Sequence, residues 1–307
     1  MVEVSNLIQL GLLGRGIEHS LSPLLQRLNG DRLNHSVAYH LYDFEVEQAK
    51  LLLRGHATSV GLPSLKDLKG LNVTRPYKEL AYLLADEASE EASALRAANT
   101  LNFAGDKLIA HNTDPEGVKT LLNALPLEGG CSTVILLGTG GASRAAAFAF
   151  LQNFPCEELI WISRDQERAQ SCLEWCRALW PALRCQWFSS QGKSQLCKGL
   201  MPLAQRKPSL LVSGATPLNE ESWFVLEEHM RPILGERFGL DAQGVIVDLN
   251  YGEERLRGVR SFSRQRGINF EGGLKMLVGQ GVASFNWWMG SQLCHEAQWA
   301  EFKHHLN

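Results

Sequence analysis

Short blocks of apolar and polar positions alternate along residues 7–112, and these blocks predict strands and helices in turn. Continuous or alternating apolar runs predict strands at 7–14, 37–44 and 70–74. Apolar residues at helical spacing predict helices at 22–33, 47–56 and 78–95. A hairpin is expected over 98–112, with its turn at Gly105 and Asp106. This alternation is typical of an α/β domain with a partly parallel sheet.

A second α/β pattern begins after a Gly-rich loop at 126–132. The predicted strands lie at 133–138, 158–163, 209–215 and 244–251. The predicted helices lie at 142–154 and 166–179. Repeated strand, helix, strand units predict a doubly wound Rossmann-type sheet. Residues 178–206 alternate poorly and no element is assigned to them.

The last part of the chain is predicted to be helical from 274 to 307, with a strongly apolar face. Met276, Gln280, Ala283 or Ser284, and Trp287 share one side at helical spacing. A glutamine on an otherwise apolar stripe is unusual, which makes Gln280 a candidate functional residue.

Composition narrows the class of protein. With 307 residues, 45% hydrophobic and 21% charged, the chain fits a globular protein of two domains. A net charge of −3 favours a small-molecule partner over nucleic acid or an anionic membrane. Seven scattered cysteines without zinc-ligand spacing predict free thiols and no metal. The absence of a signal peptide and of a long apolar segment predicts a cytoplasmic protein.

A glycine-rich loop separates the buried strand at 133–138 from the helix at 142–154. Its residues are Gly138, Gly140, Gly141, Ala142 and Ser143. Glycines allow a tight turn and close backbone approach, and the helix N-terminus attracts a pyrophosphate. The loop therefore predicts a dinucleotide site, although a plain tight turn would give the same pattern and Ser143 departs from the usual third glycine.

The next strand ends in Ser163 and Arg164, and Arg168 follows one helical turn later. Arginines at this position suit the 2′-phosphate of NADP, whereas NAD sites place an acid there. Asp165 would favour NAD if it pointed inward, or it could cap the following helix. NADP is the predicted cofactor and NAD stays possible.

Polar residues gather where the strand at 70–74 ends. Asn72 and Thr74 alternate to one face, and Lys78 opens the next helix. Ser20 and Ser22 follow the first strand in the same way, although Ser22 could simply be a helix cap. Since ligands bind at the carboxyl ends of strands in open α/β sheets, we expect a substrate site here. Asn99 and Asp114 are further candidates from the segments "AANTL" and "HNTDPEG".

Six segments, "HSLSP", "NVTRPYK", "AANTL", "NTDPEG", "GTGGASR" and "GGLKMLVGQG", occur in this order along the chain. In these segments and over nearly its whole length, the chain resembles the shikimate dehydrogenase family. The resemblance implies a substrate-binding domain at 1–113, completed by 275–307, and a Rossmann dinucleotide-binding domain at 114–274. It also implies reversible reduction of 3-dehydroshikimate to shikimate by NADPH, a step toward aromatic amino acids.

The resemblance further implies roles for individual residues. Ser20 and Ser22 would bind the substrate carboxylate, and a catalytic pair would be formed by Lys78 and Asp114. The substrate hydroxyls would be held by Asn72, Thr74, Asn99 and Gln280. Tyr251 would lie on the substrate side, and Ala215 and Gly273 on the cofactor side. The chemistry agrees, because hydride transfer to a carbonyl also requires a proton at the oxygen. A lysine is a poor base at neutral pH, so we expect the pair to share an oriented proton network that polarises the carbonyl.

Some residues depart from the family pattern. Asp165 replaces a common threonine, Lys275 a glycine and Pro115 a small residue, and the loop at 213–219 is altered. These departures lie on the cofactor and closure side. They leave open a quinate or amino-substituted substrate, a preference for NAD, and a catalytically weak module that binds metabolite and nucleotide. The oligomeric state is also left open.

Overall fold

The computed structural model describes residues 7–55, 68–125, 127, 131–189, 210–214 and 245–306. The chain forms two compact units, one of 1–117 with 277–307 and one of 118–276. It passes between them within helix α5 (Asp114–Leu122) and again within helix α11 (Leu274–Met289). The predicted boundaries fell after 113 and after 274. Neither crossing lies in a loop, whereas a sequence pattern indicates a domain boundary only where a loop separates the two domains.

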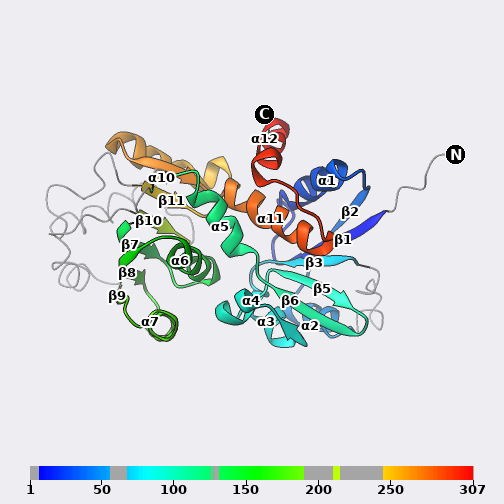
Figure 1. The fold of residues 1–307 in the computed structure, drawn as a ribbon, viewed down its shortest axis with the longest axis horizontal. Helices are drawn as coiled ribbons and strands as arrows, with labels where there is room; N and C mark the ends of the chain where they lie inside the picture. Colours follow the sequence, from blue (N-terminus) through cyan, green and yellow to red (C-terminus); the bar gives the residue numbers. More distant parts are fainter. Residues whose placement is uncertain are drawn as a thin grey trace. The chain divides into compact units, whose positions relative to one another are not determined.

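The first unit contains a mixed six-stranded sheet (Figure 1). Its strands are β1 (Ile8–Gly14), β2 (Val37–Asp43), β3 (Gly70–Val73), β4 (Glu87–Ala88), β5 (Thr100–Ala104) and β6 (Lys107–His111). They lie in the order β2-β1-β3-β5-β6-β4. β1 is parallel to both β2 and β3, whereas β5 is antiparallel to β3 and β6. The partly parallel sheet is confirmed, and so is the hairpin turn, where Gly105 has φ +64°.

The helices of this unit are α1 (Ser22–Arg32), α2 (Val46–Leu53), α3 (Lys78–Leu84), α4 (Glu90–Leu95) and α12 (His295–Leu306). The single helix predicted over 78–95 is wrong, because the chain extends at Ala85. Asp86 then accepts a bond from the Leu108 N–H, and Ser89 caps α4 by accepting from the Ala92 N–H. These local bonds, with the pairing of β4 to β6, outweigh the helical pattern. None of the helices in the described ranges is both long and apolar enough to span a membrane.

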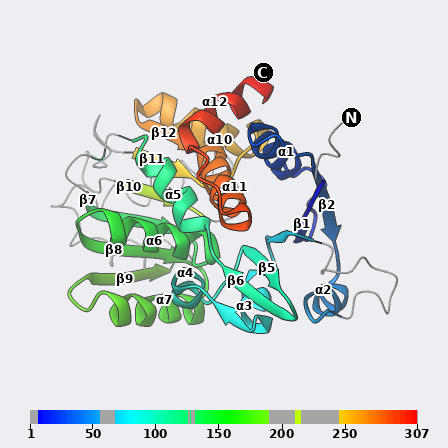
Figure 2. The ribbon, with the colours of Figure 1, turned by 45° about the vertical axis from the view of Figure 1, so that its right-hand side comes forward.

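Helix α11, coloured orange-red in Figure 2, packs against β3, where its Ser284 lies beside the polar Asn72. Trp288 covers Gly70 so closely that an added Cβ would come 2.2 Å from the indole. One turn earlier, Ser284 Oγ lies 3.1 Å from Asn72 Nδ2. Four helical residues and two strand residues both span about 6 Å, so the two repeats stay in register. This register places Ser284, and Gln280 a turn beyond it, on the side of the helix that faces the end of β3.

The second unit is built on a parallel six-stranded sheet in the order β12-β11-β10-β7-β8-β9. The strands are β7 (Cys131–Leu137), β8 (Cys156–Ser163), β9 (Arg184–Ser189), β10 (Leu210–Ser213), β11 (Val245–Asp248) and β12 (Asn269–Gly272). Its described helices include α6 (Gly141–Asn153), α7 (Gln166–Leu179) and α10 (Glu253–Arg266). This strand order, which reverses its direction of growth between β7 and β10, is that of the Rossmann fold. The predicted doubly wound sheet is therefore confirmed.

Several elements were not predicted. They are α5, β9, α10 and β12. The arginine-rich α10 buries Leu256, Val259 and Phe262, too few apolar positions to stand out in the sequence.

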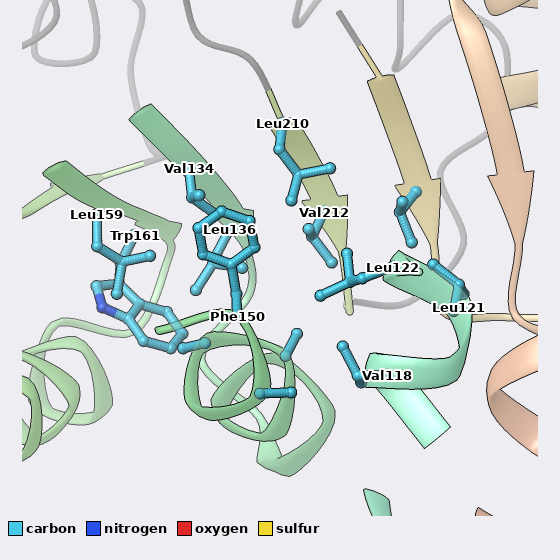
Figure 3. Close-up of a cluster of buried hydrophobic side chains, with 14 of the residues drawn as sticks. Val118, Leu121, Leu122, Val134, Leu136, Phe150, Leu159, Trp161, Leu210 and Val212 are labelled. Carbon is cyan, nitrogen blue, oxygen red and sulfur yellow. The ribbon is translucent and has the colours of Figure 1, made fainter. Parts of the chain in front are cut away.

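One face of the parallel sheet carries a dense apolar core (Figure 3). It is formed by Val134, Leu136, Leu159, Trp161, Leu210 and Val212 of the strands, with Phe150 of α6 and Val118, Leu121 and Leu122 of α5. Trp161 is fully buried. A run of buried alanines lets α6 approach the sheet closely. The core thereby fixes α6, whose first turn follows the end of β7.

The contact between Gly70 and Trp288 generates a stability prediction. Gly70→Ala should lower the free energy of unfolding by about 1–3 kcal/mol, because the buried indole must move to admit the methyl group. Urea unfolding measures the change. Gly141→Ala is the matched control, since an added Cβ there has no neighbour within 4 Å. Equal stability of the two variants would contradict the close packing at Gly70.

Candidate functional site

One edge of the first sheet collects segments from four neighbouring strands. The strand register aligns Leu12 with Asn72, Asn72 with Thr100, and Thr100 with His111. β1, β3 and β6 end at this edge, and β5 starts from it. The segments at 15–22, 74–78, 98–99 and 112–114 therefore leave the sheet side by side. With α11, these segments and β3 carry every predicted substrate-side residue except Tyr251.

Lys78 and Asp114 form the centre of this edge. Lys78 is the first residue of α3 and Asp114 the first of α5. Lys78 Nζ lies 2.6 Å from Asp114 Oδ2, and the side chains are 20% and 5% exposed. A carboxylate at a helix N-terminus is also favoured by the helix dipole. The structure thus brings the predicted catalytic pair into direct contact.

Asn99 orients the other carboxylate oxygen of Asp114. Asn99 Oδ1 accepts from the backbone N–H of Thr113 at 2.8 Å. Since a backbone N–H can only donate, this bond fixes which end of the amide is oxygen. Asn99 Nδ2 is thereby directed to Asp114 Oδ1, at 2.9 Å. Gln280 joins the cluster, with its Oε1 3.3 Å from Asn99 Nδ2.

Asn72 and Thr74 have different surroundings. Asn72 is only 5% exposed. Its Oδ1 accepts from Tyr39 Oη at 2.9 Å, and its Nδ2 donates to Ser284 Oγ and to the Asn99 carbonyl. Thr74 is half-buried, and its hydroxyl has no hydrogen-bond partner within the described ranges. Thr74 is available to a ligand, whereas Asn72 is engaged by the protein.

The two serines lie at the start of α1. Ser20 Oγ accepts from the backbone N–H of Ser22 at 3.2 Å. The N-cap position belongs to Leu21, so the alternative that Ser22 is the cap is wrong. No side chain caps the helix at Leu21. Pro23 in this turn has no N–H and the Ser22 N–H already donates to Ser20, so the two serine hydroxyls are the donors that suit an anionic group such as a carboxylate.

Asp43 holds the loop that carries these serines. Its two carboxylate oxygens accept from the backbone N–H groups of Gly16 and Ile17, both at 3.1 Å. These bonds lower the pKa of Asp43. At neutral pH the ionised carboxylate therefore fastens the loop to the end of β2.

Four polar residues of this edge were not among the predicted site residues. They are Tyr39, Thr100, Thr113 and Ser284. Thr100 and Thr113 stand beside Asn99 and Asp114 inside segments already singled out. Ser284 lies one turn after Gln280 on the apolar stripe. Their positions in these patterns were the available signal, but an ordinary threonine in a strand gives no sign that its hydroxyl is used.

In the second unit, the glycine-rich loop leaves space for a ligand. Gly138 has φ +94°, and Gly140 is the extended N-cap of α6. No side chain caps this helix, and no atom lies within 4 Å of a Cβ added at Gly140 or Gly141. Ala142 and the buried Ser143 complete the first turn. The uncapped N–H groups and the open cradle fit a pyrophosphate.

Ser163, Arg164, Asp165 and Arg168 follow β8 as predicted. Asp165 Oδ1 accepts from the Arg168 backbone N–H at 3.0 Å, so Asp165 is the N-cap of α7. This confirms the capping alternative. The Asp165 carboxylate also lies 3.4 Å from Arg168 Nε. Ser163 is buried, and Arg164 is exposed. The Asp165 carboxylate is thus paired within the first turn of α7, and the two arginines suit a phosphate.

The remaining predicted residues are spread over the second unit. Tyr251 follows β11 and is half-buried. Gly273 passes so close to the Leu249 carbonyl oxygen that a Cβ would approach it to 2.2 Å. Lys275 pairs with Glu271 at 2.8 Å, which balances its charge. Ala215 and the loop at 215–219 lie outside the described residues.

Across the described part of the chain, no group of three or more His, Cys, Asp or Glu residues is arranged to hold a metal ion. Of the cysteines, Cys156, Cys172, Cys176, Cys185 and Cys294 are free thiols.

Comparison with known proteins shows which proteins this chain is similar to. Residues 12–101 match the family model described as the shikimate dehydrogenase substrate binding domain. The NADP(+) shikimate dehydrogenase of Salinibacter ruber is 30% identical over 285 residues, covering 90% of each chain. That of Chlorobium chlorochromatii is 29% identical over 287 residues, covering 92% of this chain and 91% of the relative.

A solved structure extends the likeness to the fold. It is shikimate 5-dehydrogenase from Thermus thermophilus, in complex with NADP(H) and shikimate. The TM-score is 0.70 at 25% identity, covering 97% of this chain and 99% of that one. The likeness in sequence covers 90% of the chain and the likeness in fold 97%, and the chain belongs to the shikimate dehydrogenase family.

Proposed function

We propose that this protein catalyses the reversible NADPH-dependent reduction of 3-dehydroshikimate to shikimate. The observation that carries the proposal is the contact between Lys78 and Asp114, 2.6 Å apart and oriented by Asn99. The relatives in Salinibacter and Chlorobium are named as NADP(+) shikimate dehydrogenases, and the Thermus relative holds NADP(H) and shikimate.

Lys78 supplies the proton chemistry of this proposal. Bound NADPH supplies the hydride, and the substrate oxygen must gain a proton as the carbonyl becomes an alcohol. Lys78 Nζ carries up to three protons, one of which is directed to Asp114 Oδ2. The others can be donated to the substrate oxygen, first to polarise the carbonyl and then to protonate it. In the reverse direction Nζ takes the proton back.

The remaining substrate contacts follow from the same edge. Ser20 and Ser22 bind the carboxylate through their hydroxyls beside the uncapped start of α1. Thr74 and the half-buried Gln280 hold the ring hydroxyls, and Tyr251 is the further substrate-side residue. Asn72 and Asn99, predicted to share this work, have their polar atoms engaged by protein groups, so their part is indirect.

The cofactor is held by the second unit. The first turn of α6, with Gly138, Gly140, Gly141, Ala142 and Ser143, receives the pyrophosphate. Arg164 and Arg168 bind the 2′-phosphate, since Asp165 is turned into the cap of α7 and presents no free acid to it. Gly273 and Ala215 complete the cofactor side, together with Ser163.

Replacing Lys78 tests the reaction. Lys78→Ala should lower kcat for shikimate oxidation with NADP by about 10²–10⁴-fold, the usual contribution of a positioned acid or base. Shikimate binding, measured by calorimetry, should persist. Lys107→Ala is the control, because Lys107 pairs with Glu87 on the exposed surface of the same unit. Nicotinamide absorbance is followed with shikimate and quinate. A Lys78→Ala variant as active as the parent would refute this role, and faster quinate oxidation would change the assigned substrate.

The arginines test the cofactor assignment. Arg168→Ala and Arg164→Ala should each raise KM for NADP by about tenfold or more, because a charged hydrogen bond to phosphate is lost. KM for NAD should stay near the parent value, since NAD lacks the 2′-phosphate. Arg177→Ala, an exposed arginine later in α7, is the control. An equal rise in KM for both cofactors would contradict a 2′-phosphate site.

A further inference from the structure

A chain of buried polar side chains leads from β2 to the catalytic pair. Its members are Tyr39, Asn72, Ser284, Thr100 and Asn99, and each neighbouring pair is hydrogen-bonded. Asn72, Thr100, Ser284 and Asn99 are 5%, 0%, 0% and 2% exposed. Hydrogen bonds in such dry surroundings are stronger than in water, and an unsatisfied group there is costly. The chain ends at Asp114 Oδ1, which accepts from Asn99.

Its direction can be derived from the groups that have only one choice. Asn99 Oδ1 accepts from the Thr113 N–H, so Thr100 Oγ1, at 2.8 Å from the same oxygen, must donate to it. Thr100 Oγ1 has then given its only proton, and Ser284 Oγ lies 2.7 Å from it and 2.9 Å from the Gln280 carbonyl, to which Ser284 can donate. Ser284 has one hydroxyl proton for these two acceptors, so the direction of its bond to Thr100 is not fixed. Ser284 Oγ in turn accepts from Asn72 Nδ2 at 3.1 Å.

The orientation of Asn72 is fixed in the same way. Its Nδ2 lies 3.2 Å from the Asn99 carbonyl, which can only accept, so this end of the amide must be the nitrogen. Its Oδ1 therefore faces Tyr39 and accepts from the phenol at 2.9 Å. The bonds from Tyr39 to Ser284 and from Thr100 to Asp114 therefore point the same way, and the contact between Ser284 and Thr100 joins these two halves.

We propose that Thr100 and Ser284 are positioning residues for the reaction, acting through this hydrogen-bonded chain to hold the Asn99 amide and thereby Asp114. The inference rests on the proposed function. Within the chain, Thr100 is the side chain that donates to the second acceptor position of Asn99 Oδ1. Without it, the amide oxygen keeps the Thr113 N–H at 2.8 Å and the longer contact to Thr113 Oγ1 at 3.2 Å, and the amide is held less firmly toward Asp114. Asp114 then orients Lys78 less well. Thr100 and Ser284 do not contact the pair themselves and act on it through Asn99.

Ser284 connects this chain to α11. Its hydroxyl also lies 2.9 Å from the Gln280 carbonyl and 3.0 Å from Thr113 Oγ1. Thr113 Oγ1 lies 3.0 Å from the same Gln280 carbonyl. The hydroxyl of Ser284 therefore sits where the backbone of α11 meets the β5–β6 hairpin. Losing it should disturb the chain at the same point as losing Thr100.

The test compares Thr100→Val with Thr100→Ser. Valine keeps the branched shape and removes the donor, whereas serine keeps the donor and removes a methyl group. Thr100→Val should lower kcat for shikimate oxidation about tenfold to a hundredfold, with KM for shikimate changed less than about threefold, the cost expected for a buried hydrogen bond. Thr100→Ser should restore kcat to within about threefold of the parent, because the donor is kept.

Ser284→Ala should lower kcat in the same way. Because both residues act through one chain, Thr100→Val combined with Ser284→Ala should lose less than the product of the single losses. Ser291→Ala is the control, since Ser291 bonds Asn286 in the same unit and lies outside the chain. Its kcat should match the parent.

The outcomes separate this inference from the proposed function. If the parent turns over shikimate and Thr100→Val matches it in kcat, or if Thr100→Ser is as slow as Thr100→Val, the positioning role is refuted. If the two single losses multiply in the double variant, the residues act independently and the chain is refuted. If the parent itself does not oxidise shikimate with NADP, the proposed function fails and this inference falls with it.

Discussion

The buried amide of Asn99 is the constraint on which the candidate site depends. Its oxygen must accept from a backbone N–H of Thr113, and this single requirement sends its nitrogen toward Asp114. Asp114 can then present its other oxygen to Lys78. The amide joins the start of β5, the end of β6, α5 and α11, so the geometry of the pair is fixed by the sheet itself. A lysine and an aspartate on two surface loops would have no such restraint.

A related constraint governs how the sheet is assembled. β1 and β3 are parallel, and β5 runs antiparallel to both β3 and β6, yet all four place a chain end at one edge. α11 matches this edge because its turn is about as long as two residues of β3. Gly70 admits Trp288, and that contact sets the register that brings Ser284 to Asn72. The contact between Gly70 and Trp288 thereby determines the polar contact between Asn72 and Ser284 beside the site.

Sequence patterns predicted the regular parts of this arrangement and missed the parts decided by tertiary contacts. β1, β2, β3, the hairpin and the doubly wound sheet follow from local periodicity and turn residues, which act over a few positions. The break between α3 and α4 depends on Leu108, which is distant from Asp86 along the chain, and no local pattern contains it. Lys78 was found because polar residues gather at the end of a predicted strand, and Asn99 and Asp114 were found in the segments "AANTL" and "HNTDPEG". Thr100, Thr113 and Ser284 were missed because a hydroxyl in a strand or helix looks ordinary until its partners are known.

The departures from the family pattern show the same limit of prediction from sequence, because the partners of the changed residues are known only from the structure. Asp165 and Lys275 each put a charge near the expected cofactor side, and in the sequence alone both argue against a normal site. In the structure, Asp165 caps α7 and pairs with Arg168, and Lys275 pairs with Glu271 one turn before it. Neither charge stands alone, so neither repels a phosphate or disturbs the helix start as an isolated charge would. A substitution signals a change in chemistry only when no neighbouring residue compensates for its charge. Here each compensating residue lies three or four positions away along the chain.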